Sequence, residues 1–121
     1  MVPAPFTGTC TNAHVPSFAK LTSDFKAKGV DEVVCCAVSD PYAHFNWAEK
    51  MGVLDKMSFL ADWDGSFSEE FDLLKNYDAE PGCGLGKRAK RVSMVVVNGE
   101  VKAFNVVTDA ANDGSVCLEA C

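Results

Sequence analysis

The sequence predicts a layered α/β fold in which a mixed sheet is flanked by helices. Apolar runs of strand length alternate with amphipathic segments along most of the chain, and an Asn-Gly dipeptide separates two apolar runs near its end. The alternation is typical of strands joined by helices, and the dipeptide is typical of an antiparallel hairpin. With 121 residues the chain is long enough for a single domain, residues 1–121, and too short for two.

The first helix is expected over residues 16–28. Phe18, Leu21 and Phe25 recur at helical spacing with polar residues between them, and Gly29 follows the last turn. These features predict an amphipathic helix that ends at a glycine.

A strand is expected next, over residues 32–38, because this run is continuous, apolar and rich in valine. Such runs are typical of parallel strands buried on both faces. The nine residues before Cys10 are too irregular for a full strand, so we expect the first strands of the fold to be lacking. Residues 109–121 show no helix long enough to cover the sheet.

The second helix is expected to begin at Pro41, with Asp40 as its N-cap, and to end before Gly52. Its predicted apolar face comprises Tyr42, Phe45 and Ala48. Residues 57–61 form another apolar run of strand length, followed by a turn at residues 62–65.

Ser66 and Glu69 then predict a capping box for a short helix that carries Phe67, Phe71 and Leu74. Residues 75–90 lack periodicity and contain several glycines, which predicts a loop. Residues 91–97 and 100–107 flank Asn98-Gly99 and predict a hairpin with a type I′ turn.

Composition restricts the possible partners. The formal net charge of −6 disfavours binding to nucleic acid, and the basic run Lys87 to Arg91 is too short to reverse that expectation. No stretch approaches the roughly 20 apolar residues that cross a bilayer, so no membrane partner is expected. The first residues lack the pattern of a signal peptide. We therefore expect a cytoplasmic protein, or an organellar one if a targeting segment precedes Met1.

The six cysteines favour free thiols over a disulfide framework. Cys35 and Cys36 are adjacent in a predicted strand, where successive side chains point to opposite faces, and are expected to pack in the core. Cys83 is expected to be an exposed bystander in the loop. Cys117 and Cys121 have metal-ligand spacing, but a second ligand pair is missing from the sequence, so neither a metal nor a cofactor is expected.

Cys10 is the best candidate for a reactive residue. It lies just before the first predicted helix, whose backbone N–H groups and dipole stabilise an anion at that position. Thr7, three residues earlier, can place a hydroxyl near the sulfur. This arrangement is suited to exposing a reactive thiolate.

The segment from Pro3 to Cys10 resembles the active-site motif of the peroxiredoxin family, in which a threonine and a cysteine follow a proline at four and seven positions. Further similar segments are residues 11–18, 28–35, 38–42, 59–62 and 90–96. The resemblance implies a thioredoxin-like fold and a thiol peroxidase that reduces hydrogen peroxide and small organic hydroperoxides.

The resemblance also implies roles for individual residues. Cys10 would attack the O–O bond and become a sulfenic acid, Thr7 would hydrogen-bond the thiolate and the peroxide, and Pro3 would shield the site from water. Arg91 matches the arginine that holds the thiolate in its charged form. Cys35 matches the position of a resolving cysteine in some members of the family, and Cys117 lies near its position in others, so both stay open as alternatives.

Thioredoxin, glutaredoxin or a small thiol would supply the electrons, and a homodimer is compatible with the resemblance. Two other functions stay open: a non-catalytic remnant that acts by association with a partner, and a thiol–disulfide oxidoreductase, which the lack of a C-x-x-C pair disfavours. His14 is expected to be a hydrogen-bonded structural residue, and His44 has no assigned role.

Overall fold

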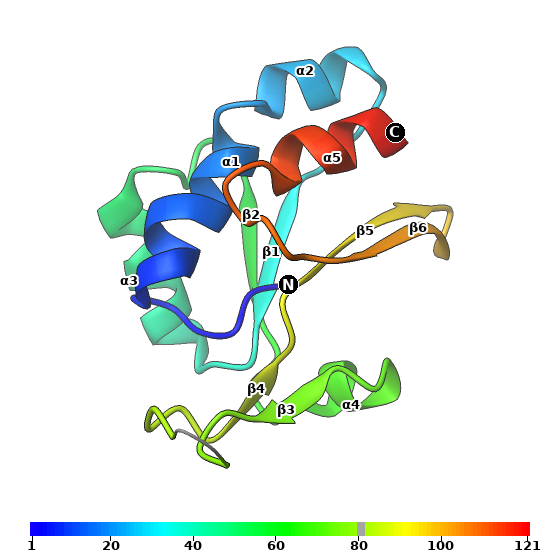
Figure 1. Cartoon of the computed structure of the whole chain (residues 1–121). Coiled ribbons are helices and arrows are strands. Elements are labelled where there is room, and N and C mark those ends of the chain that lie inside the picture. The colour runs from blue at the N-terminus through cyan, green and yellow to red at the C-terminus, as the bar shows by residue number, and fades with distance from the viewer. Residues whose placement is uncertain (80–81) are drawn as a thin grey trace.

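The computed structural model of the chain describes residues 1–79 and 82–121, in which helices and strands alternate (Figure 1). The helical elements are η1 (Cys10–His14, a π-helix), α1 (Val15–Ala19), α2 (Thr22–Ala27), α3 (Pro41–Met51), α4 (Ser66–Glu70) and α5 (Asp113–Ala120). The strands are β1 (Val34–Ala37), β2 (Ser58–Ala61), β3 (Leu74–Asn76), β4 (Lys87–Ala89), β5 (Val92–Val97) and β6 (Glu100–Val106).

The strands pair both parallel and antiparallel, as predicted, but within residues 1–79 and 82–121 they form three two-stranded sheets. β1 and β2 are parallel, whereas β3–β4 and β5–β6 are antiparallel. In the last pair Asn98 and Gly99 have φ angles of 52° and 78°, which confirms the predicted turn residues of the hairpin.

The start of the chain connects two of these sheets. The amide of Val2 donates to the carbonyl of Cys36 in β1 at 3.0 Å, and the amide of Val92 in β5 donates to the carbonyl of Met1 at 3.2 Å. The amino group of Met1 donates to the carbonyl of Val92 at 2.6 Å. Figure 1 accordingly shows the N-terminus between β1 and β5.

The apolar core lies between β1 and the helical elements η1, α1 and α3. Its largest fully buried side chain is Trp47 of α3. Val2, Cys10, Val15, Ala19, Cys35, Ala37, Ala48, Val53 and Met57 complete the buried cluster. Cys10 is therefore part of the buried apolar core.

The start and end of α3 are as predicted. The Asp40 carboxylate accepts from the Ala43 amide at 2.8 Å, and Gly52 closes the helix with a φ of 68°. The predicted apolar face was wrong, because Tyr42 and Phe45 are 79% and 52% exposed.

His44, Trp47 and Ala48 are buried in their place. The buried His44 ring is satisfied at one nitrogen only: its Nε2 donates to the carbonyl of Cys35 at 3.2 Å, whereas its Nδ1 has no hydrogen-bond partner among the described residues. Helical spacing allowed either face of α3 to be the buried one, and packing against β1 and β2 selected the histidine-bearing face.

Several predicted elements differ in the structure. The helix predicted over residues 16–28 is divided into α1 and α2, and the π-helix η1 precedes them. Pro16 has no backbone N–H to donate to the preceding turn, which belongs to η1. β1 is shorter than predicted and buried on one face only, since Val34 is 45% exposed. The capping box was also wrong: the Asp62 carboxylate, not Ser66, accepts from the amides of Phe67 and Ser68.

The segment predicted as a loop, residues 75–90, contains most of the β3–β4 pair, although residues 80–81 lie outside the described part of the chain.

The expectation that residues 109–121 contain no covering helix was also wrong. α5 spans eight residues and contacts α1, beside which Figure 1 shows it. It is held by close packing rather than by helix propensity, because Gly114 lies directly against the backbone of Ser17.

Candidate active site

Cys10 is the first residue of η1 and is 1% exposed. The preceding loop turns tightly into this helix, and the amide of Thr11 donates to the carbonyl of Thr7 at 3.0 Å. Phe6 has a φ of 62°, a left-handed conformation that is costly for a bulky side chain and is typical of functional sites. The loop thus places the Cys10 sulfur in the first turn of the helix.

Arg91 lies immediately before β5 and reaches the Cys10 sulfur. Its Nη2 donates to Cys10 Sγ at 3.4 Å, and its Nη1 lies 3.1 Å from Nδ1 of His14. The structure thus brings together Cys10 and Arg91, which are 81 residues apart in the sequence. A guanidinium can donate in two fixed directions at once and stabilises a negatively charged sulfur.

His14 connects this pair to α5. Its Nε2 lies 2.7 Å from Oδ2 of Asp113, the first residue of that helix. The other oxygen, Oδ1, accepts from Ser93 Oγ at 3.0 Å and from Asn105 Nδ2 at 2.9 Å. A continuous hydrogen-bonded path therefore runs from the Cys10 sulfur to a buried carboxylate.

Burial lowers the pKa of His14, and the hydrogen bond to Asp113 partly opposes this effect. The ring is therefore neutral at pH 7. Since arginine only donates hydrogen bonds, Nδ1 must be the acceptor, and the ring proton lies on Nε2 and points at Asp113. The expectation of a hydrogen-bonded histidine is confirmed.

Pro3 and Thr7 lie in the same loop but are not joined to Cys10 by any hydrogen bond in the described part of the chain. Pro3 is buried. The hydroxyl of Thr7 donates to the carbonyl of Ala4 at 2.7 Å, so its proton is already engaged and its oxygen is left as an acceptor.

The two candidate resolving cysteines are both buried thiols. Cys35 belongs to the same apolar cluster as Cys10, and burial raises its pKa to about 12. Cys117 lies on α5, where burial and then its neighbour Cys121 raise its pKa to about 11. Neither thiol ionises readily near neutral pH.

The three cysteines without a proposed role are less buried. Cys36 is half-buried, and Cys83 and Cys121 are exposed. Within residues 1–79 and 82–121, no group of three or more His, Cys, Asp or Glu side chains is arranged to hold a metal ion. Nor does the described part of the chain contain a helix that is long and apolar enough to cross a membrane.

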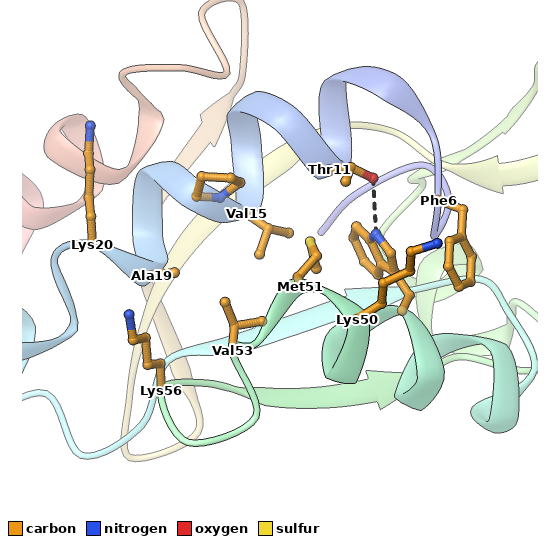
Figure 2. Close-up of a pocket in the computed structure, with 11 residues that line it drawn as sticks. Phe6, Thr11, Val15, Ala19, Lys20, Lys50, Met51, Val53 and Lys56 are labelled. Atoms are coloured by element: carbon orange, nitrogen blue, oxygen red, sulfur yellow. Dashed lines mark hydrogen bonds between the residues drawn. The ribbon is translucent and has the colours of Figure 1, made fainter.

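A groove of about 670 Å³ lies beside the helix that carries Cys10, between η1–α1 and α3 (Figure 2). Thr11 and Trp47 form part of its wall and are joined by a hydrogen bond of 3.0 Å. Lys20, Lys50 and Lys56 also line it. Cys10 and Arg91 are not among the lining residues, so the groove is next to the sulfur site but separate from it.

Sequence reasoning did not find Ser93, Asn105 or Asp113. Ser93 lies in the family-like segment 90–96, but nothing in that segment gave it a role, and Asn105 and Asp113 lie in no motif. The only available signal was the Asn-Asp-Gly sequence at the start of α5, which resembles a helix N-terminus.

Known proteins resemble the chain over most of its length. The family described as Redoxin matches residues 1–116. The relative named "Peroxiredoxin-2F, mitochondrial" from Oryza sativa subsp. japonica is 46% identical over 105 residues, which cover 87% of this chain and 52% of the relative. The relative of the same name from Arabidopsis thaliana is 44% identical over 105 residues, covering 87% and 51%.

Among solved structures, that of reduced Prx3 from Vibrio vulnificus in complex with hydrogen peroxide is 31% identical. It superposes with a TM-score of 0.88 over 99% of this chain and 77% of that chain. The fold is therefore the thioredoxin-like fold of the peroxiredoxins, as predicted.

The chain belongs to the redoxin family. Within that family its relatives are peroxiredoxins, and it spans about half the length of the curated relatives it matches, 52% and 51%.

Proposed function

We propose that this chain is a thiol-dependent peroxidase that reduces hydrogen peroxide and small organic hydroperoxides at Cys10. The observation that carries the proposal is the contact of 3.4 Å between the Arg91 guanidinium and the Cys10 sulfur. A permanent cation at this distance favours the thiolate and also attracts the oxygen that becomes negative during the reaction. Membership of the redoxin family over residues 1–116 supports the same chemistry and a single domain over residues 1–121.

In the proposed reaction the Cys10 thiolate attacks the terminal oxygen of the hydroperoxide. The S–O bond forms as the O–O bond breaks, the leaving alkoxide or hydroxide takes up a proton, and Cys10 becomes a sulfenic acid. Arg91 stabilises the sulfur before the attack. Thr7 offers its free lone pairs to the proton of the hydroperoxide, and buried Pro3 keeps water away from the sulfur.

A second thiol must then attack the sulfenic acid and release water. Cys35 and Cys117 are the candidates within the chain, and their pKa values of about 12 and about 11 make both of them slow nucleophiles at neutral pH. An external thiol is the third candidate. Thioredoxin, glutaredoxin or a small thiol would supply the electrons in every case, and dimerisation belongs to the same proposal.

The cellular location is also a proposal. The sequence alone favours the cytoplasm or an organelle, and two relatives that are 46% and 44% identical are named mitochondrial. We propose the mitochondrion on that similarity. Microscopy of the fluorescently labelled gene product tests it, and a signal confined to the cytoplasm would contradict it.

The function is tested by adding stoichiometric hydrogen peroxide to the reduced chain and following its intact mass with time. We expect rapid oxidation that is lost in Cys10→Ser and retained in Cys83→Ser, the matched control at an exposed thiol. Peptide mapping of any disulfide identifies the resolving cysteine. Slow oxidation that is the same in all three proteins would contradict a peroxidase and favour the non-catalytic remnant.

A further inference from the structure

We propose that Asp113 is a positioning residue for the Cys10 site, acting through His14 on Arg91. This inference rests on the proposed function, since it concerns the reactivity of the same sulfur. The path consists of three contacts: Asp113 Oδ2 to His14 Nε2 at 2.7 Å, His14 Nδ1 to Arg91 Nη1 at 3.1 Å, and Arg91 Nη2 to Cys10 Sγ at 3.4 Å.

The first step of the argument is the orientation of the histidine ring. Arg91 has only donors, so it can bind Nδ1 only while that nitrogen carries no proton. A proton on Nδ1 would face the guanidinium and push it away from its present position. The tautomer of His14 therefore decides whether Arg91 can point at Cys10.

The second step is the control of that tautomer. The proton stays on Nε2 because the Asp113 carboxylate accepts it there at 2.7 Å. His14 and Asp113 are 3% and 1% exposed, so water cannot replace either partner. The titratable and charged groups that face His14 are Arg91, Asp113 and the amino group of Met1.

The third step is the fixing of Asp113 itself. A carboxylate is costly to bury unless its oxygens are hydrogen-bonded. Ser93 and Asn105, one from each strand of the β5–β6 hairpin, both donate to Oδ1, which leaves Oδ2 for His14. The carboxylate is thus held from two directions and aimed at the ring.

The attachment of α5 to the rest of the fold does not by itself explain why the Asp113 carboxylate is buried beside His14. The helix is also attached through the amide of Gly114, which donates to Ser17 Oγ at 3.1 Å. Ser17 Oγ donates to the backbone carbonyl of His14 at 2.7 Å, and within the described part of the chain no hydrogen bond joins Ser17 to the His14 ring. Ser17→Ala is therefore the matched control, because it weakens the attachment of α5 and leaves the path to the sulfur in place.

The experiment measures the rate of Cys10 alkylation by iodoacetamide across a pH series, resolved by peptide mass. Asp113→Asn keeps the size of the side chain, but its amide cannot accept from His14, Ser93 and Asn105 together. We expect alkylation at neutral pH about tenfold slower, in line with the loss of one charge-assisted hydrogen bond, and a pH profile displaced to higher pH. Ser17→Ala should lower stability and leave the profile unchanged.

A double-variant cycle tests whether Asp113 acts through His14. In a His14→Ala background, adding Asp113→Asn should change the alkylation rate by less than about twofold, because the connection is already broken. If the two effects multiply instead, Asp113 does not act through the ring, and the inference is wrong. It is also wrong if folded Asp113→Asn keeps the rate and pH profile of the unchanged chain.

Should Asp113→Asn fail to fold, nitrogen–hydrogen correlation spectra of the isotope-labelled original chain decide the matter. A neutral His14 ring with its proton on Nε2 supports the inference, whereas a proton on Nδ1 at neutral pH overturns it. Neither measurement uses peroxide, so a failure of the proposed peroxidase activity and a failure of the positioning role are recognised separately.

Discussion

Arg91 makes two directed contacts with one planar group, and this predicts how a lysine would perform in its place. Arg91→Lys keeps the positive charge but cannot reach both Cys10 and His14, which the guanidinium contacts at 3.4 and 3.1 Å. We expect Cys10 oxidation by hydrogen peroxide to be roughly 10- to 100-fold slower, which corresponds to losing one charged hydrogen bond. Intact-mass kinetics measure the rate.

Lys87→Ala is the control for that experiment, because Lys87 is exposed in the same basic run. An unchanged rate in Arg91→Lys would show that charge alone is sufficient and that the geometry of the guanidinium does not matter.

The two histidines predict a loss of stability in mild acid. Burial lowers the pKa values of both His14 and His44 below the ordinary 6.5. As the pH falls below that value, the unfolded chain takes up protons before the folded chain does, so the free energy of unfolding decreases until the folded pKa values are reached. The slope approaches about 1.4 kcal/mol per pH unit for each histidine.

Urea unfolding at a series of pH values measures this slope. His44→Gln removes one titrating group but keeps an N–H for the carbonyl of Cys35, which His44 Nε2 contacts at 3.2 Å. We expect the variant to lose the contribution of one histidine, up to about 1.4 kcal/mol per pH unit between pH 7 and pH 5. A slope equal to that of the original chain would show that His44 is not kept neutral by burial.

At the scale of the elements, α5 depends on one close contact. A Cβ built on Gly114 would lie 2.0 Å from the carbonyl oxygen of Ser17, which is backbone and cannot move aside cheaply. Gly114→Ala should therefore displace α5 and lower the free energy of unfolding by about 1–3 kcal/mol, despite the better helix propensity of alanine.

Urea denaturation compares Gly114→Ala with Ser115→Ala, an exposed position on the same helix. The control should be within about 0.5 kcal/mol of the original chain. Equal urea midpoints for the two variants would mean that Gly114 does not lie directly against the backbone of Ser17.

Elements with strong local signals were predictable. The start and end of α3 follow from Asp40, Pro41 and Gly52, and the hairpin follows from Asn98-Gly99, because caps and turns are set by neighbouring residues. The strands β3 and β4 were missed, since three residues are too few to show a period. α5 was missed because its place in the fold depends on a contact with Ser17, 97 residues away.

At the scale of the whole molecule, packing is uneven, and this predicts an uneven pattern of hydrogen exchange. β1 lies against the buried cluster, whereas Val96, Val97 and Val106 of the β5–β6 hairpin are 52%, 46% and 62% exposed. Hydrogen bonds in thinly covered regions open more easily. We expect the amides of Cys35 and Ala37 to be more strongly protected than those near the hairpin turn.

Hydrogen–deuterium exchange followed by peptide mass spectrometry measures this difference. Protection of the hairpin tip equal to that of β1 would contradict it and would indicate that the exposed strands are covered in solution.

The site was only partly predictable, because it draws on both ends of the chain. Cys10 and Thr7 were proposed from their local sequence, and Arg91 from resemblance to a family. The structure brings Cys10 and Arg91 together, whereas the hydroxyl of Thr7 is bonded to the carbonyl of Ala4. The contact of His14 with Asp113 joins residues 99 positions apart and has no local signal. Polar networks of this kind are fixed by tertiary structure, which explains why Ser93, Asn105 and Asp113 were not identified.

The hydrogen bonds of Met1 and Val2 affect how the protein should be handled in the laboratory. The Met1 amino group donates to Val92, the residue next to Arg91, at 2.6 Å. Acetylation or an affinity tag at this end would replace the buried amino group, whose pKa burial lowers, with an amide and would direct extra chain between β1 and β5. Purification tags and spectroscopic labels therefore belong after Cys121, which is exposed at the far end of α5.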